Sequence, residues 1–265
     1  MRSGIIVAST RERAQVHGVH GATGLTYWAC LARRTGLHGG WEAIEWACLP
    51  PGGVSGEHLH TRTEELYLLL TGHGEISLDG RRHRVTAGDA VLTGLGTRHG
   101  LRNTGDEPLE WLVIELTAVD PTTAPTTGGT PGRTPDTTTG ASPGRPIEAP
   151  PTTDLPHPLL HSTVVTNLRR IGPLDPRVVL TGPLRSVEVV GLNAAERIEL
   201  AADGVEHTVF VTAGSGHAGT GEVRVPLAPG TSITLPLGTA AALTAGLDGL
   251  EYVHAVLTVP TGGHS

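Results

Sequence analysis

Three histidines and one glutamate in the first half of the chain have the residue types and spacing of a metal site. His58 and His60 are separated by one residue, Glu65 follows, and His99 lies further along. Side chains two positions apart on a β-strand point the same way, so His58 and His60 should face one side together. Neutral imidazole and carboxylate groups suit Fe, Mn, Ni, Co, Cu or Zn. The pattern predicts one divalent ion in a small β-barrel, with coordination positions left open, whereas a structural site is more often closed by Cys and His.

The elements that must position these side chains read as short β-strands. Gly, Pro and Asp-Gly turns separate most of the β-favouring runs, and no helix of more than two turns is compelling. A segment of weak helical character spans Thr10–Val16. The expected strands that frame the site are Glu42–Leu49, Glu65–Thr71, His73–Leu78, Ala90–Thr93 and Leu109–Leu116. Antiparallel strands at this spacing suit a double-sheet jelly roll.

With these residues in view, the segment from about 40 to 117 resembles the two signature motifs of the cupin superfamily. The first motif, G-x5-H-x-H-x3,4-E-x6-G, is met in full by Gly52, His58, His60, Glu65 and Gly72. The second, G-x5-P-x-G-x2-H-x3-N, is met except that Gly94 replaces the proline; its matching positions are Gly88, Gly96, His99 and Asn103. The missing proline should loosen a turn without removing a ligand.

The resemblance implies a double-stranded β-helix in which His58, His60, Glu65 and His99 ligate a divalent metal, with Fe(II) or Mn(II) favoured over Ni, Co, Cu and Zn. It fixes the reaction poorly, because one fold hosts many chemistries. The first expectation is a metal-dependent oxygenase acting on a small organic molecule. A redox-neutral isomerase, cyclase, decarboxylase or lyase is the second, and a non-catalytic metabolite-binding protein is the third.

Strand alternation extends the predicted site. If Glu65 faces the barrel interior, Tyr67 does too, and a phenol near a metal can orient substrate or shuttle a proton. Tyr67 is therefore the candidate catalytic residue, although a structural aromatic with a hydrogen-bonded hydroxyl is an open alternative. Glu64 alternates outward and reads as a surface charge. On the preceding strand the more apolar set, which is expected to line the barrel, is Ile44, Trp46 and Cys48.

The second half of the chain repeats the first. Gly72 and Gly88 have counterparts in Gly214 and Gly230, at a shift of 142 residues. At this shift the four ligand positions become Leu200, Ala202, His207 and Ala241, of which only His207 can bind a metal. The sequence therefore predicts a bicupin with a metal-binding domain at 1–119 and a degenerate domain at 158–265. The Pro-, Thr- and Gly-rich tract at 120–157 is expected to be a flexible linker.

Composition narrows the partners. The chain has 265 residues and a net charge of −7, with no basic cluster, which argues against nucleic acid or anionic membranes. No apolar run is long enough to span a bilayer and no signal peptide is evident, so a cytoplasmic location is expected. The expected partner is a small-molecule substrate, and a homodimer is the candidate assembly. Cys30 and Cys48 are read as reduced thiols, with a disulfide or a thiol near the metal as the alternatives.

Overall fold

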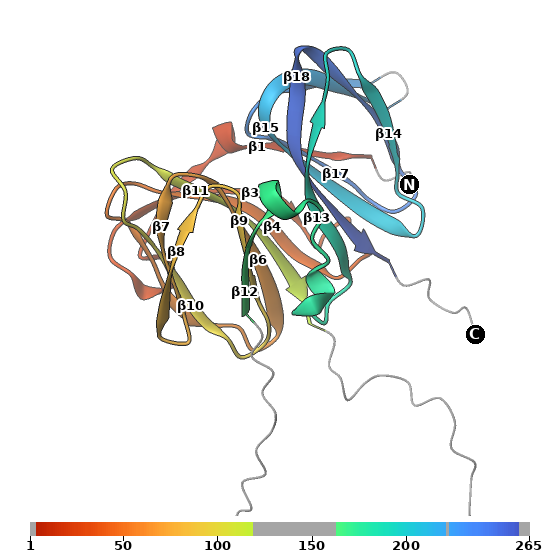
Figure 1. Ribbon diagram of the computed structural model, residues 1–265. Helices are drawn as coiled ribbons and strands as arrows, with labels where there is room; N and C mark the ends of the chain where they lie inside the picture. Colours follow the sequence, from red (N-terminus) through yellow and green to blue (C-terminus); the bar gives the residue numbers. More distant parts are fainter. Residues whose placement is uncertain (1–3, 119–162, 221–222, 260–265) are drawn as a thin grey trace, which may run out of the picture. The chain divides into compact units, whose positions relative to one another are not determined.

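The computed structural model describes residues 4–118, 163–220 and 223–259, and these residues form an almost entirely β structure (Figure 1). The single α-helix among them is α1 (Leu168–Ile171), one turn long. The expected architecture of two all-β jelly rolls is confirmed. The tract at 120–157, expected to be a linker, lies outside the described residues. None of the described helices is long and apolar enough to cross a membrane.

The first barrel consists of two antiparallel sheets. The smaller sheet has the order β5–β10–β7–β8 and comprises β5 (Val54–Leu59), β10 (Arg98–Asn103), β7 (His73–Leu78) and β8 (Arg81–Thr86). The larger sheet has the order β12–β9–β6–β11–β4–β3–β2. Its strands are β12 (Thr163–Asn167), β9 (Asp89–Thr93), β6 (Thr63–Thr71), β11 (Leu109–Thr117), β4 (Trp41–Leu49), β3 (Leu25–Arg33) and β2 (Ala14–His17). All five strands expected from the sequence are present, within two residues of their expected ends.

The second barrel is one sheet with the central order β1–β17–β15–β18–β13, to which β14 and β16 are added. Its two longest strands have register shifts that let them bend around the barrel. The strands are β1 (Ile6–Ser9), β13 (Leu184–Leu192), β14 (Arg197–Ala201), β15 (Val205–Thr220), β16 (Val223–Leu227), β17 (Thr231–Leu235) and β18 (Ala240–Thr258).

Each barrel's sheet includes a strand from the other half of the chain. Strand β1, from the N-terminal segment, pairs with β17 in the second barrel. Strand β12, which follows residues 119–162, pairs with β9 in the first barrel. The segment Thr10–Val16 is not helical as expected. A 3-10 turn at Thr10–Glu12 leads directly into β2, because pairing with β3 overrides the weak helical propensity.

The central strands of the larger sheet of the first barrel are buried on both faces, which corrects one expectation from the sequence. The side chains of Ile44, Trp46 and Cys48 pack with Phe210 and Val253 of the second barrel rather than lining the first. The alternate residues of β4, Glu45, Ala47 and Leu49, face the interior of the first barrel instead. Because both faces of β4 are buried, apolar character could not identify the inner one.

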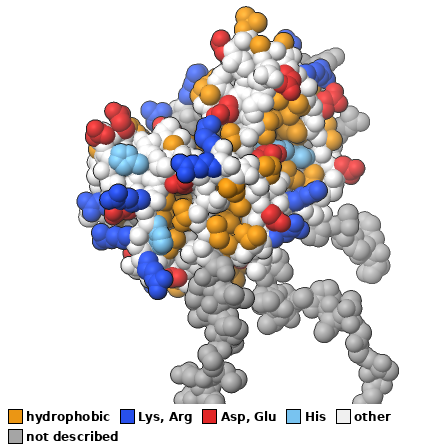
Figure 2. Space-filling model, in the orientation of Figure 1, with side chains coloured by type: hydrophobic (Ala, Val, Ile, Leu, Met, Phe, Trp, Pro, Cys, Tyr) orange, Lys and Arg blue, Asp and Glu red, His pale blue; other side chains and the backbone are white. Residues whose placement is uncertain are grey.

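Glu64 is not a surface charge but is 1% exposed. Its carboxylate accepts hydrogen bonds from the backbone N–H of Thr181, at 2.8 Å, and from that of Gly182, at 2.8 Å. At a shift of 142 residues, the equally buried Glu206 accepts hydrogen bonds from the backbone N–H of His38 and Gly39. Side chains of opposite charge are interspersed over the face shown in Figure 2. Cys30 and Cys48 are free thiols on neighbouring strands.

Candidate metal centre

Three strands of the first barrel bring the predicted ligands together. His58 on β5 and His99 on β10 are direct cross-strand partners, so their side chains emerge next to each other. His60 follows the end of β5, and Glu65 lies on β6 in the larger sheet. The candidate centre therefore lies between the two sheets of this barrel, where ligands from both can meet.

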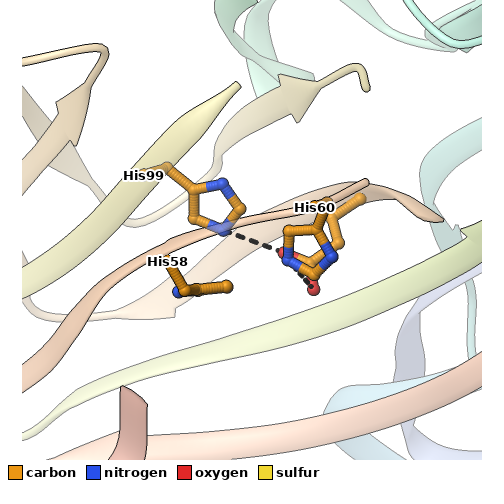
Figure 3. A group of neighbouring side chains, drawn as sticks. His58, His60 and His99 are labelled. Atoms are coloured by element: carbon orange, nitrogen blue, oxygen red, sulfur yellow. Dashed lines mark ion pairs between the residues drawn. The ribbon is translucent and has the colours of Figure 1, made fainter. Parts of the chain in front are cut away.

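The donor atoms of these four residues converge. One donor atom from each of His58, His60, Glu65 and His99 can be chosen so that all lie within 4.8 Å of one another. His60 Nε2 lies 3.1 Å and His99 Nε2 lies 2.9 Å from the two carboxylate oxygens of Glu65 (Figure 3). Neighbouring ligands of an octahedral ion, bound at about 2.1 Å, lie about 3.0 Å apart. The spacing therefore fits a shared divalent ion.

The converging atoms have no other hydrogen-bonding role. The Nε2 atoms of His58, His60 and His99 and the Oε2 atom of Glu65 are buried and make no hydrogen bond to described residues outside this cluster. Buried polar atoms without partners are uncommon in folded proteins, and four facing one point call for an explanation. A metal ion that accepts all four lone pairs supplies that explanation.

Two of the histidines are oriented through their second nitrogen. His58 Nδ1 lies 3.1 Å from the carbonyl oxygen of Gly56, to which it can only donate. His60 Nδ1 lies 2.7 Å from Thr63 Oγ1. A proton on Nδ1 leaves the Nε2 lone pair free, and such outer contacts commonly fix the tautomer of metal ligands.

The electrostatics also suit metal binding. Burial, followed by the neighbouring His99, lowers the pKa of His58 to about 4, so its imidazole is neutral at physiological pH. Burial alone would raise the pKa of Glu65, yet the adjacent imidazoles of His60 and His99 hold that pKa well below its usual range. His58 is thus neutral and Glu65 ionised, the protonation states that ligands require, whereas the Glu65 carboxylate outweighs burial and raises the pKa of His60.

A cavity of about 450 Å³ opens beside the ligands. Its walls are mostly apolar, and His60 and Glu65 form part of its surface. The other lining residues are Val16, Val19, His20, Thr26, Trp28, Glu45, Ala47, Ser55, Tyr67, Trp111, Val113 and Glu115. Pockets of this size hold small organic molecules.

Tyr67 lies in this cavity, as the alternation of β6 predicts. Its ring is nearly perpendicular to that of His99, with centroids 5.2 Å apart. Burial, together with the Glu65 carboxylate, raises the pKa of Tyr67 well above its ordinary value. The phenol therefore stays protonated and is suited to donate a hydrogen bond. Its catalytic role stays a prediction.

Glu45 and Glu115 are cavity residues that the sequence analysis missed. Glu115 is the cross-strand partner of Glu65, and Glu45 is that of Val113. Trp28 Nε1 donates a 2.9 Å hydrogen bond to Glu45. Burial raises the pKa of both carboxyl groups. Glu115 could have been found from the sequence, because it lies on β11 opposite Glu65. Glu45 could not, because the alternate residues of β4 are more apolar and were expected to face the interior.

His20 also belongs to the site, and the sequence analysis did not identify it. Its ring stacks on that of His58, with centroids 3.5 Å apart and planes within 9°. The residue has a left-handed backbone (φ 52°) in the short turn Val19–Gly21, preceded by Gly18. Strained conformations of this kind are enriched at functional sites. No spacing rule links this turn to the ligand motif, so only the fold reveals it.

The second barrel does not reproduce the centre. His207 lies at the position equivalent to Glu65, but its Nδ1 is 3.0 Å from Nε2 of His254 and its Nε2 is 3.1 Å from the carbonyl oxygen of Ala201. Both ring nitrogens are therefore occupied. Among the residues described, the first-barrel cluster is the one group of at least three potential ligands that converge.

Comparison with known proteins agrees with the fold. Residues 45–115 match the model of the Cupin domain family. An oxalate-binding protein from Thermotoga maritima is 31% identical over 115 residues, which is 42% of this chain and 93% of that protein. The relative is thus matched almost completely by less than half of the present chain.

Solved structures resemble most of the chain. The pirin YhhW of Escherichia coli in complex with nickel(II) has a TM-score of 0.63 and 15% identity, covering 96% of this chain and 99% of that one. Oxalate decarboxylase of Bacillus subtilis, studied for its Mn(II) centres, has a TM-score of 0.60 and 14% identity, covering 97% and 78%. At these identities the likeness concerns the fold. The match to the Cupin domain family, together with the 31% identical relative, shows that this chain belongs to the cupin superfamily, and its two barrels make it a bicupin.

Proposed function

We propose that this protein is a metal-dependent enzyme that binds one divalent ion through His58, His60, Glu65 and His99 and acts on a small organic molecule. The convergence of buried donor atoms that lack other partners supports this proposal most directly. The adjoining cavity gives a substrate room beside the ion. The Thermotoga relative is an oxalate-binding protein, which supports a small metal-chelating molecule as the class of ligand, and nickel and manganese are candidate ions by the same comparisons.

Such an ion would supply Lewis acidity, polarising a carbonyl or enol oxygen of the substrate. The protein's own residues supply the remaining functions. Tyr67 offers a hydroxyl that donates a hydrogen bond, and the apolar walls exclude water. Glu45 and Glu115, on the paired strands β4 and β11, can take a proton from the substrate and return it. Burial raises the pKa of each above its ordinary value.

This pair of carboxyl groups favours a redox-neutral reaction, such as an isomerisation, cyclisation, decarboxylation or lyase reaction. An oxygenase is the second candidate, favoured by the three-histidine, one-glutamate ligand set and by the apolar cavity. Anaerobic and aerobic turnover of a panel of keto and enol compounds separates the two. Turnover that continues without O2 supports the redox-neutral reaction, and strict O2 consumption supports the oxygenase.

The metal centre itself is tested by elemental analysis after supplementation with each candidate ion. We expect close to one equivalent of metal in the native chain and loss of that metal in His58→Ala and in His99→Ala. His83→Ala is the matched control, since His83 is an exposed histidine of the same barrel. Metal retained at the native level in both ligand variants would refute the site. A loaded protein that turns over no compound would instead support the metabolite-binding alternative.

A further inference from the structure

The cavity beside the metal centre has an unusual balance of charge. Three acidic residues line it, Glu45, Glu65 and Glu115, and none of its described lining residues is an Arg or a Lys. A divalent ion bound to Glu65 carries about one uncompensated positive charge. That charge can hold an uncharged chelator or a monoanion. A dianion would need a further cation, and these walls do not supply one.

The walls are shaped for a ring. Apolar and aromatic side chains form most of the surface, and the volume of about 450 Å³ greatly exceeds the needs of a two-carbon diacid. The ring-bearing or branched apolar residues are Val16, Val19, Trp28, Trp111 and Val113. Filling this space with apolar atoms of a ligand would contribute to binding by removing them from water.

One hydrogen-bond donor in these walls has no partner among the described residues. Trp111 is 3% exposed, and its indole Nε1 is buried without a hydrogen bond to any of them. The other three tryptophans each donate to a glutamate: Trp28 to Glu45, Trp41 to Glu206 and Trp46 to Glu110. Buried indole N–H groups usually find an acceptor, and Trp111, a lining residue of the cavity, lacks one among the described residues.

We propose that the cavity takes an uncharged or singly charged ring compound that chelates the metal through two oxygen atoms and offers a further acceptor to Trp111 Nε1, and that it discriminates against small dicarboxylates. This inference rests on the proposed metal centre. It makes Trp111 a specificity-determining residue and the acidic walls a barrier to dianions.

The test is calorimetric titration of the metal-loaded protein with two probes, maltol and oxalate. Maltol is a hydroxypyranone ring that chelates as a monoanion, whereas oxalate is a small dianion. We expect maltol to bind more tightly than oxalate. Trp111→Phe should weaken maltol binding about fivefold, the cost of one lost hydrogen bond. Trp46→Phe, which removes an indole N–H outside the cavity, is the matched control and should leave both affinities unchanged.

A third variant tests the charge argument separately. Glu45→Gln keeps the shape of the wall while removing a carboxyl group, so it should strengthen oxalate binding several-fold and change maltol binding little. Tighter binding of oxalate than of maltol by the native protein would overturn the inference, as would equal effects of the Trp111 and Trp46 variants. Metal content, measured beforehand, distinguishes these outcomes from failure of the metal centre itself.

Discussion

At the level of single residues, the candidate centre depends on atoms that never touch the ion. Thr63 lies at the start of β6, two residues before Glu65, and its hydroxyl contacts Nδ1 of His60. Gly56 holds Nδ1 of His58 through its backbone carbonyl. These contacts fix the tautomer and the ring orientation of each imidazole, so that Nε2 is directed toward the candidate centre.

Replacing Thr63 by Val removes the hydroxyl and keeps the shape of the side chain. We expect the metal affinity to fall about tenfold, because the imidazole of His60 loses its fixed orientation. Competition with a chromophoric chelator measures the change. Thr61→Val, at an exposed position in the same connection, is the control. An affinity that is equal in the two variants would mean that Thr63 does not orient His60.

The convergence of the four candidate ligands was predictable because its signal is local. His58 and His60 are two residues apart, so strand alternation places them on one side. The same rule places Tyr67 on the side of Glu65. Glu45 was not predictable, since the second barrel covers the outer face of β4 and makes both of its parities apolar. When a second domain covers the outer face of a strand, both faces become apolar, and the sequence no longer shows which face points into the barrel.

At the level of elements, the turn that carries His20 is packed against β5 with no space to spare. A Cβ atom added at Gly56 would overlap the carbonyl oxygen of His20, so only glycine permits this approach. The same glycine provides the carbonyl that orients His58. One position on β5 therefore sets both the ligand and the turn stacked over it.

Gly56→Ala should destabilise the fold by about 1–3 kcal/mol, because the turn or the strand must move to relieve the overlap. Gly191→Ala is the control. Gly191 lies in β13 without a positive φ, and a methyl group added there would meet no heavy atom within 4 Å, so the change should be neutral or stabilising. Urea unfolding measures both. Equal stability of the two variants would contradict the close packing of the His20 turn.

At the level of the whole molecule, two glutamates related by the 142-residue shift join the barrels reciprocally. Glu64 of the first barrel receives backbone N–H groups from the second-half segment at Thr181. Glu206 of the second receives backbone N–H groups from the segment at His38, together with the Trp41 indole at 3.0 Å and the Leu237 backbone at 3.1 Å. Each immediately precedes the residue at the metal-ligand position, Glu65 or its counterpart His207.

Glu206→Ala should lower the free energy of unfolding by about 2–5 kcal/mol, since several buried N–H groups lose their acceptor at once. Chemical denaturation monitored by tryptophan fluorescence is the measurement. Glu199→Ala, with a side chain 76% exposed, should change the stability by less than about 0.5 kcal/mol. A similarly small change in Glu206→Ala would show that this junction contributes little to the fold.

The sequence repeat predicted a second barrel and the loss of its metal ligands, because Gly and Pro positions survive when ligands do not. It could not predict that Glu64 is buried, since alternation places Glu64 outside one barrel without revealing that another barrel lies there. It also did not predict the crossing of β1 and β12, because the unpaired N–H and C=O groups of a sheet edge can pair with any strand that reaches them.

That crossing has a consequence for how the gene can be divided. A cut made anywhere between β11 and β12 yields an N-terminal piece that carries β1, which belongs to the second barrel. The C-terminal piece carries β12, which belongs to the first barrel. Neither piece would be self-sufficient, as each would expose an open sheet edge where the missing strand belongs. When the two pieces are produced together, each supplies the strand that the other lacks. This protein is therefore better suited to split-protein complementation than to the study of its barrels as separate domains.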